Sequence, residues 1–301
     1  MGSDTSSSRR VGVYIDLGET LADGGKASWA DIRGMAREAD RIGCDSVWLP
    51  DRLQVGDVGV WESLTMVSAI AAVTSRVTIG TAVTRSIYRN PTLLAKMAET
   101  IDEISGGRFV LGLGAGSNAG DNVQFGYPSN HPISRFEEAL SITHALLRTG
   151  SVSFSGRYYQ VQDCSLSPRG PRQSGPPIMI AATQPRMMRL AAKYADYWTS
   201  LTLANSPDDW QEELAAIASA CAAEGRDPAT LKKVAAVLVT QLPPVEHPYG
   251  PAMSGEADQI AESINRFFHA GFHEVIVYPA PNSPEAISAL EPVVAALKDE
   301  Q

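Results

Sequence analysis

Residues 178–199, Ile178-Met-Ile-Ala-Ala-Thr-Gln-Pro-Arg-Met-Met-Arg-Leu-Ala-Ala-Lys-Tyr-Ala-Asp-Tyr-Trp-Thr199, contain a complete strand–helix–strand unit. The apolar run at 178–181 predicts a strand, and the periodic apolar residues at 185–194 predict a helix that begins at a proline. A second apolar run at 197–199 predicts the next strand. Neither run alternates with polar residues, which is typical of parallel strands buried on both faces.

The same unit repeats in both directions along the chain. Further strands are predicted at 11–15, 46–49, 77–83, 109–113, 234–242 and 274–278, and further helices at 29–41, 62–74, 90–105, 134–147, 207–224, 256–269 and 284–297. About eight strand–helix pairs in this length predict an α/β protein with a (β/α)₈ TIM barrel. An open, doubly wound sheet is the alternative with the same alternation.

Three details complete the predicted organisation. Polar residues 1–10 are expected to be a disordered tail, and residues 11–301 a single domain. Ser134 and Glu137 form a capping box, which predicts that a helix begins there. Residues 117–177 are expected to form an insertion that includes a hairpin at 152–161. Its two long connections, 117–132 and 151–177, are expected to border the substrate pocket.

The composition of the 301-residue chain excludes several kinds of partner. With 25 Lys and Arg against 34 Asp and Glu, the formal charge is −9 and no basic cluster is present, which argues against nucleic acid. The apolar stretches are too short to span a membrane. Cys44, Cys164 and Cys221 fit neither a disulfide framework nor a metal site, so we expect a cytoplasmic protein without a metal.

In a barrel, the residues that follow the strands form the active site. Here these positions include 51–52, 81–85, 114–118 and 182–186. They hold no lysine for a Schiff base, no pair of glutamates and no histidine ligand set, which disfavours aldolases, PLP enzymes, glycoside hydrolases and metallohydrolases. A mouth rich in Gly, Ala, Thr and Asn suits a bound cofactor that supplies the reactivity. No individual catalytic residue is identified.

Two segments of this mouth are candidates for cofactor binding. Gly112-Leu-Gly-Ala-Gly116 departs from the dinucleotide fingerprint in its spacing, so its glycines either permit a sharp turn and close packing or leave room for a flat ring. The junction at 181–186 leads into a helix with proline at its first position. Such a helix start offers free N–H groups to a phosphate, here near Thr183 and Gln184.

Taken in order, several segments resemble the bacterial luciferase-like flavin monooxygenase family, including its branch that uses the deazaflavin coenzyme F420. They include Cys44-Asp-Ser-Val-Trp-Leu-Pro-Asp51, Ile79-Gly-Thr-Ala-Val83, Ser105-Gly-Gly-Arg-Phe-Val-Leu-Gly-Leu-Gly-Ala-Gly116 and Pro177-Ile-Met-Ile-Ala-Ala182. The resemblance implies a TIM barrel, a homodimer, and FMN or F420 at the mouth. By position, the cofactor would contact Asp51, Ala82, Val83, Gly116, Ser117, Asn118, Ala182, Thr183 and Gln184.

The resemblance also bears on local geometry and chemistry. It implies a cis peptide bond between Ala82 and Val83, and it leaves Asp51 either to orient a ring N–H or to cap the following loop. F420-dependent sugar-phosphate dehydrogenases of the family carry His and Glu where this chain has Arg52 and Ser117, so that branch is excluded.

The resulting expectation is an oxidoreductase that acts on a small organic substrate. With F420 the reaction would be hydride transfer. With FMN it would be oxygenation by O₂, with reduced flavin supplied by a separate reductase. A non-catalytic flavin-binding barrel protein is the alternative.

Overall fold

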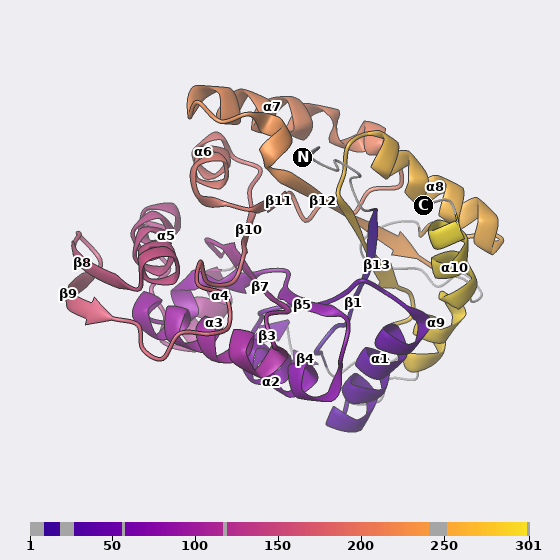
Figure 1. Ribbon diagram of the computed structural model, residues 1–301, viewed down its shortest axis with the longest axis horizontal. Helices are drawn as coiled ribbons and strands as arrows, with labels where there is room; N and C mark the ends of the chain where they lie inside the picture. The colour runs from indigo at the N-terminus through magenta and orange to yellow at the C-terminus, as the bar shows by residue number, and fades with distance from the viewer. Residues whose placement is uncertain (1–8, 19–26, 56–57, 117–118, 241–251, 300–301) are drawn as a thin grey trace.

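Eight parallel strands close into a barrel in the computed structural model of this chain, which describes residues 9–18, 27–55, 58–116, 119–240 and 252–299 (Figure 1). In order around the barrel they are β1 (Arg10–Tyr14), β2 (Ser46–Leu49), β5 (Thr78–Thr81), β7 (Phe109–Gly114), β10 (Ile178–Ala181), β11 (Tyr197–Thr199), β12 (Lys232–Val239) and β13 (Glu274–Pro279). The ring closes because β13 pairs with β1 and β10 pairs with β7, both in parallel. The predicted TIM barrel is therefore confirmed, and the open sheet is wrong.

Helices surround the barrel; all but the last two, α9 and α10, lie between strands along the chain (Figure 1). They are α1 (Trp29–Ile42), α2 (Ser63–Val73), α3 (Pro91–Ser105), α4 (Ala119–Gln124), α5 (Pro132–Thr149), α6 (Pro185–Tyr194), α7 (Gln211–Ala223), α8 (Ala257–His269), α9 (Pro284–Ala289) and α10 (Glu291–Asp299). Capping residues determine where several of these helices begin. Ser28 caps α1 through a capping box with Asp31, and Asn90 caps α3 ahead of Pro91.

Helix α5 begins earlier than its capping box predicts. Its first residue is Pro132, preceded by His131 in the left-handed region at φ 52° with no side-chain cap. The fixed φ of proline suits the first helical position, so the helix starts there. Ser134 lies inside the first turn, where its hydroxyl accepts a hydrogen bond from Arg186. The predicted start at Ser134 is wrong.

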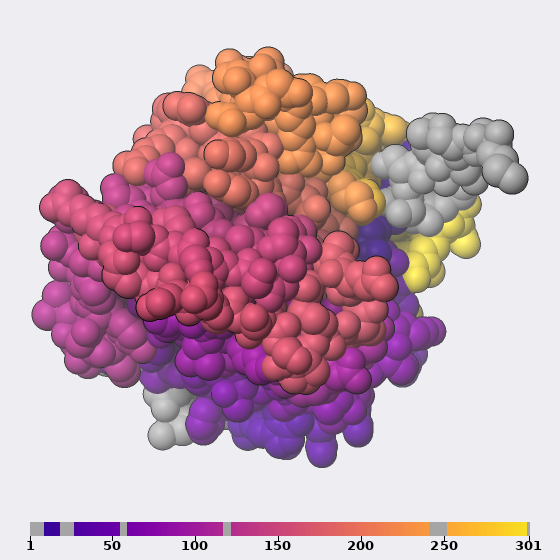
Figure 2. Space-filling view, turned by 60° about the vertical axis from the view of Figure 1, so that its left-hand side comes forward, coloured from indigo at the N-terminus to yellow at the C-terminus, as the bar shows by residue number. Residues whose placement is uncertain are grey.

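The predicted hairpin is confirmed as β8 (Ser151–Ser155) paired in antiparallel fashion with β9 (Gln160–Ser165). The Glu138 carboxylate of α5 holds its turn by accepting the backbone N–H groups of Arg157, Tyr158 and Tyr159 at 2.8–3.0 Å. The hairpin extends beyond α5 in Figure 1, and Figure 2 shows this rose-coloured part of the chain on the outer surface. The insertion predicted at 117–177 is therefore narrower, because α5 belongs to the ring of helices.

Apolar side chains fill two layers. The larger layer lies between strands and helices, and the smaller one fills the barrel interior with Tyr14, Trp48, Ala82, Val110, Met179, Val234 and Ile276. The tail predicted at 1–10 ends sooner, because Arg10 is the first residue of β1 and donates to the Asp45 carbonyl, whereas residues 1–8 lie outside the described part. Across the described ranges, no helix combines the length and apolarity that a bilayer span requires.

Candidate cofactor site at the barrel mouth

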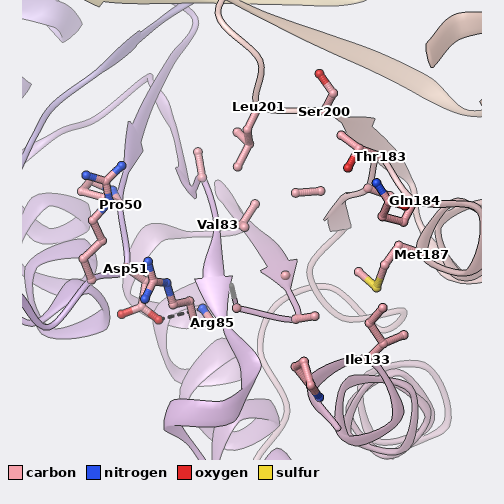
Figure 3. Close-up of a pocket in the computed structure, with 18 residues that line it drawn as sticks. Pro50, Asp51, Val83, Arg85, Ile133, Thr183, Gln184, Met187, Ser200 and Leu201 are labelled. Carbon is pink, nitrogen blue, oxygen red and sulfur yellow. Dashed lines mark hydrogen bonds between the residues drawn. The ribbon is translucent and has the colours of Figure 1, made fainter. Parts of the chain in front are cut away.

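A cavity of about 460 Å³ opens at the C-terminal ends of five strands, β2, β5, β7, β10 and β11 (Figure 3). Its lining consists of Pro50, Asp51, Arg52, Ala82, Val83, Arg85, Gly114, Ala115, Gly116, Pro132, Ile133, Ala181, Ala182, Thr183, Gln184, Met187, Ser200 and Leu201. This is the end of a TIM barrel at which active sites lie. The volume lies in the range of small-molecule and cofactor sites.

The barrel brings most of the residues expected at a cofactor site to this one cavity. Asp51, Ala82, Val83, Gly116, Ala182, Thr183 and Gln184 all belong to its lining. Ser117 and Asn118 lie outside the described residues. Of the two long connections expected to border the substrate pocket, 117–132 contributes Pro132 to the lining of this cavity. No residue of 151–177 is part of the lining, so that half of the expectation is wrong for this cavity.

One wall is a bulge between β5 and the short strand β6 (Thr84–Arg85). The peptide bond between Ala82 and Val83 is cis, as the family resemblance implied. Thr81 fixes the start of the bulge: its hydroxyl donates to the Gly112 carbonyl at 2.9 Å and accepts the Gly112 N–H at 3.0 Å. Thr84 donates its own hydroxyl to Thr81 at 2.9 Å, so both ends of the bulge are held.

The close approach of the bulge explains why two positions of β7 are glycine. A Cβ built on Gly112 would overlap the Thr81 carbonyl oxygen, and one built on Gly114 would lie 2.8 Å from Val83 Cγ2. Both distances are shorter than side chains tolerate, so these glycines permit the close approach of the neighbouring bulge. Of the two alternatives for the Gly-rich segment, close packing explains Gly112 and Gly114.

Asp51 lies at the rim with no exposed side-chain surface, and its carboxylate is fully engaged. It accepts two hydrogen bonds from the Arg89 guanidinium, at 2.6 and 3.1 Å. It also accepts the Arg85 N–H at 3.0 Å (Figure 3). Arg89 also pairs with Glu62. Burial by itself would lower the pKa of Arg89, but the hydrogen bonds to Asp51 and Glu62 raise that pKa above its usual range. The contacts of Asp51 are those of a loop-fixing residue.

The opposite wall is the start of α6 (Figure 3). Gln184 is the N-cap, Pro185 occupies the first position, and no side chain caps this end. Thr183 and Gln184 are exposed and line the cavity, so the start of α6 lies at the cavity wall. The first N–H groups of a helix have no partner within the helix. The Arg186 side chain forms an ion pair with Glu137 of α5. This pairing neutralises the Glu137 carboxylate.

Among the described residues of the lining, the charged ones are Asp51, Arg52 and Arg85. Because Asp51 is neutralised by Arg89, the described lining presents no unpaired carboxylate. It contains no His, Cys, Lys or Glu. Within the described ranges, no group of three His, Cys, Asp or Glu side chains is arranged to hold a metal ion.

Sequence reasoning missed three apolar residues of the lining: Ile133, Met187 and Leu201. Ile133 and Met187 show only the apolar spacing of helix residues, which does not distinguish a cavity wall from a core. Leu201 follows β11 in a left-handed conformation at φ 58°, which no local pattern around a leucine predicts.

The fold and this cavity together define a TIM-barrel protein with a candidate site at the C-terminal strand ends. A family model for luciferase-like monooxygenases matches residues 10–247. The chain therefore belongs to the luciferase-like monooxygenase family.

Two curated relatives show what this chain is similar to. It is 33% identical over 178 residues to a phthiodiolone/phenolphthiodiolone dimycocerosates ketoreductase of Mycobacterium tuberculosis, covering 58% of this chain and 46% of the relative. It is 31% identical over 203 residues to a 4-hydroxyprotoasukamycin monooxygenase of Streptomyces nodosus subsp. asukaensis, covering 66% of this chain and 53% of the relative. The chain thus spans about half the length of these relatives.

A solved structure agrees in fold. An F420-dependent secondary alcohol dehydrogenase in complex with an F420–acetone adduct superposes with a TM-score of 0.77 at 18% identity, covering 96% of this chain and 98% of the other. At this identity the match shows the shared barrel fold.

Proposed function

We propose that this protein is an oxidoreductase that binds a flavin-type cofactor, FMN or coenzyme F420, in the mouth cavity and acts on a small organic substrate there. One observation carries the proposal: an apolar cavity of about 460 Å³ joins the bulge wall to an uncapped helix start, and its described lining contains no acid–base group besides a paired aspartate. A site without its own reactive groups depends on a bound cofactor for its chemistry.

The residues present fit such a cofactor. Val83 and Leu201 offer apolar surface to a ring system. The side chain of Ala82 is small, so it leaves space in the cavity for that ring. The uncapped start of α6 offers N–H groups near Thr183 and Gln184 to a phosphate. Arg52 and Arg85 favour further negative charge on the cofactor or on the substrate. When bound, the cofactor supplies hydride transfer or activation of O₂.

The chain's own contribution is positioning. The bulge is held by Thr81 and Thr84 on the barrel side and by Asp51 on the rim, so the wall behind the ring is rigid. The apolar lining at Ile133, Met187 and Leu201 excludes water from the reacting face. Substrate selection then depends on the loops around the cavity, as is usual for TIM barrels.

Of the two reactions, we favour hydride transfer with F420. The described lining has no side chain that titrates near neutral pH, and direct hydride transfer demands few protein acid–base groups. The 33% sequence identity to a ketoreductase supports reduction of a carbonyl group. Oxygenation with reduced FMN is the second candidate, because the chain is also similar to a monooxygenase over 66% of its length.

The deciding experiment is a pair of titrations of the purified protein, one with FMN and one with F420, followed by absorbance. Binding of F420 and oxidation of reduced F420 by a carbonyl compound would support hydride transfer. Binding of FMN and substrate-dependent O₂ uptake with reduced FMN would support oxygenation. A protein that binds neither contradicts the proposal, and one that binds a cofactor without turnover is the non-catalytic alternative.

We further propose a homodimer in a reducing, cytoplasmic environment. All three cysteines are unpaired, and Cys44 and Cys221 are buried, which suits a reducing compartment. The dimer is an expectation from the family, and the mass in solution measured by light scattering tests it.

A further inference from the structure

Arg85 is a charged residue of the cavity lining whose backbone is held from two sides. Its N–H donates to the Asp51 carboxylate at 3.0 Å. It also pairs in register with Gly114, where β6 runs parallel to β7. Because Asp51 is itself held by Arg89, the backbone of Arg85 has a rigid support at the rim of the cavity.

The side chain of Arg85 is positioned along its length. Its stem passes Gly116, because a Cβ built on Gly116 would lie 3.7 Å from Cβ and Cδ of Arg85. At the tip, Nη1 donates a hydrogen bond to the Tyr88 hydroxyl at 2.7 Å, and the guanidinium carbon lies 5.6 Å from the centre of the Tyr88 ring. Tyr88 is buried and packs against Tyr127 with ring centroids 5.0 Å apart. The guanidinium is therefore anchored to a buried tyrosine.

An arginine positioned in this way is suited to bind a carboxylate. A guanidinium presents N–H donors in a planar fork that matches the two oxygens of a carboxylate, and such charge-assisted hydrogen bonds are strong. A long side chain ordinarily loses rotamer entropy when it binds a ligand. The contacts with Gly116 and Tyr88 restrict Arg85 before a ligand arrives, so this loss is smaller here.

The place of Arg85 in the cavity indicates which molecule carries the carboxylate. In Figure 3 Arg85 lies beside Asp51 at one end of the cavity, and Thr183 and Gln184 lie at the other end. The second end is the proposed position of the cofactor phosphate. FMN carries no further anionic group on its side chain, and the acidic tail of F420 continues from its phosphate. A carboxylate at the Arg85 end therefore belongs to the substrate.

We propose that Arg85 binds a carboxylate group of the substrate, so that the substrate class is an organic acid, and that Tyr88 is a positioning residue for this arginine. The uncharged part of the substrate then extends from the rim along the cavity toward Val83. This inference rests on the proposed function, because the substrate is defined by its reaction with a bound cofactor.

The test measures the binding of matched probes to the protein loaded with whichever of FMN and F420 it binds. The probes are benzoate and hexanoate, each compared with its amide, because benzamide and hexanamide have nearly the same shape without the charge. The variants are Arg85→Gln, Arg85→Lys and Tyr88→Phe. Arg189→Gln is the control, because Arg189 is an exposed residue of α6 that pairs with Glu224 and is not part of the described lining. Calorimetric titration gives the Kd of each probe and of the cofactor, and the Tm reports whether each variant is folded.

We expect the wild type to bind at least one acid more tightly than its amide by at least about tenfold. Arg85→Gln should bring acid and amide to within about twofold of each other. Arg85→Lys should keep part of the preference, because the charge remains while the fork is lost. Tyr88→Phe should weaken binding of the acid and not of the amide, whereas a merely structural role of Tyr88 would affect both alike. Arg189→Gln should keep the wild-type preference.

Three results separate this inference from the proposed function. If the loaded wild type binds neither acid more tightly than its amide, or if Arg85→Gln keeps the preference, the assignment of Arg85 is wrong and the proposed function stands. If Arg85→Gln weakens the binding of F420 by about tenfold and leaves the preference unchanged, Arg85 binds the acidic tail of the cofactor and the substrate assignment is wrong. If the wild type binds neither cofactor, the proposed function itself fails.

Discussion

Arg89 holds Asp51 in a buried, two-pronged ion pair at the rim of the cavity, with Nη1 2.6 Å from Oδ2 and Nη2 3.1 Å from Oδ1. Only 8% of the arginine side chain is exposed, and none of the aspartate side chain is. The same carboxylate accepts the Arg85 N–H, so the pair connects the end of β2 to the bulge after β5. The geometry of the rim therefore depends on an arginine that is not part of the cavity lining.

Replacing Arg89 with glutamine is expected to leave Asp51 buried without its counter-charge. Loss of one partner of a buried ion pair costs about 3–5 kcal/mol of unfolding free energy. We expect cofactor binding to weaken as well, because the bulge loses its fixed position. Urea denaturation and cofactor titration measure the two effects.

Arg172→Gln is the matched control for that variant. Arg172 pairs with the buried Asp102 and also donates to the Phe109 carbonyl, at the N-terminal end of β7 and therefore far from the mouth. It should lower stability without changing the Kd for cofactor. If Arg89→Gln lowers stability but leaves the Kd unchanged, the pair has no role in the site. The double variant Asp51→Asn with Arg89→Gln covers the case in which the single variant does not fold.

Thr183→Glu is expected to weaken cofactor binding at least tenfold, about 1.4 kcal/mol. The reason is that a carboxylate at the start of α6 would occupy and repel the proposed phosphate position. Thr183→Val serves as the control, since it keeps the backbone N–H groups and adds no charge. If the Glu variant and the wild type bind the cofactor with equal affinity, the phosphate does not bind at the start of α6.

Gly112→Ala is expected to lower the unfolding free energy by at least about 2 kcal/mol, because the added Cβ overlaps the Thr81 carbonyl oxygen and overpacks the bulge. Gly34→Ala is the control: Gly34 lies within α1, and nothing lies within 4 Å of its added Cβ. That variant should be stabilised by roughly 0.5–1 kcal/mol. Denaturant unfolding of the two variants side by side decides the matter, and similar curves would contradict the explanation of the glycine.

Stability should also decline in mild acid because of His273. Burial, together with the nearby charges of Lys232 and Arg10, lowers the pKa of His273 to about 4 from 6.5. Between these two values the unfolded chain binds a proton that the folded chain does not, so lowering the pH favours unfolding by up to about 1.4 kcal/mol per unit. Below pH 4 this contribution stops growing.

The measurement for His273 is the unfolding free energy of wild type and His273→Asn between pH 7 and pH 4.5. The slope should be smaller in the variant than in the wild type. Parallel curves for the two proteins would show that His273 titrates normally in the folded state.

The fold was predictable because its signals are local. Buried strands appear as continuous apolar runs. The first residues of α1 and α3 follow from the N-caps Ser28 and Asn90 and from Pro91 directly after Asn90. The error at α5 has the same origin: two local start signals compete within three residues, and Pro132 rather than Ser134 begins the helix. The strand-end pattern also placed Asp51, Ala82 and Thr183 at one mouth, because parallel strands end at the same side of a barrel.

What the sequence did not determine are relations between distant segments. The partner of Asp51 is 38 positions away, and the reason for Gly112 is the bulge 31 positions earlier. The left-handed turn that brings Leu201 to the cavity depends on its anchoring to β12. Hydrogen bonds and close contacts of this kind form only once the barrel closes and sets which strand ends are neighbours. The sequence by itself therefore determined the barrel and the end at which the candidate cavity lies, and the tertiary structure decided which side chains form the cavity walls.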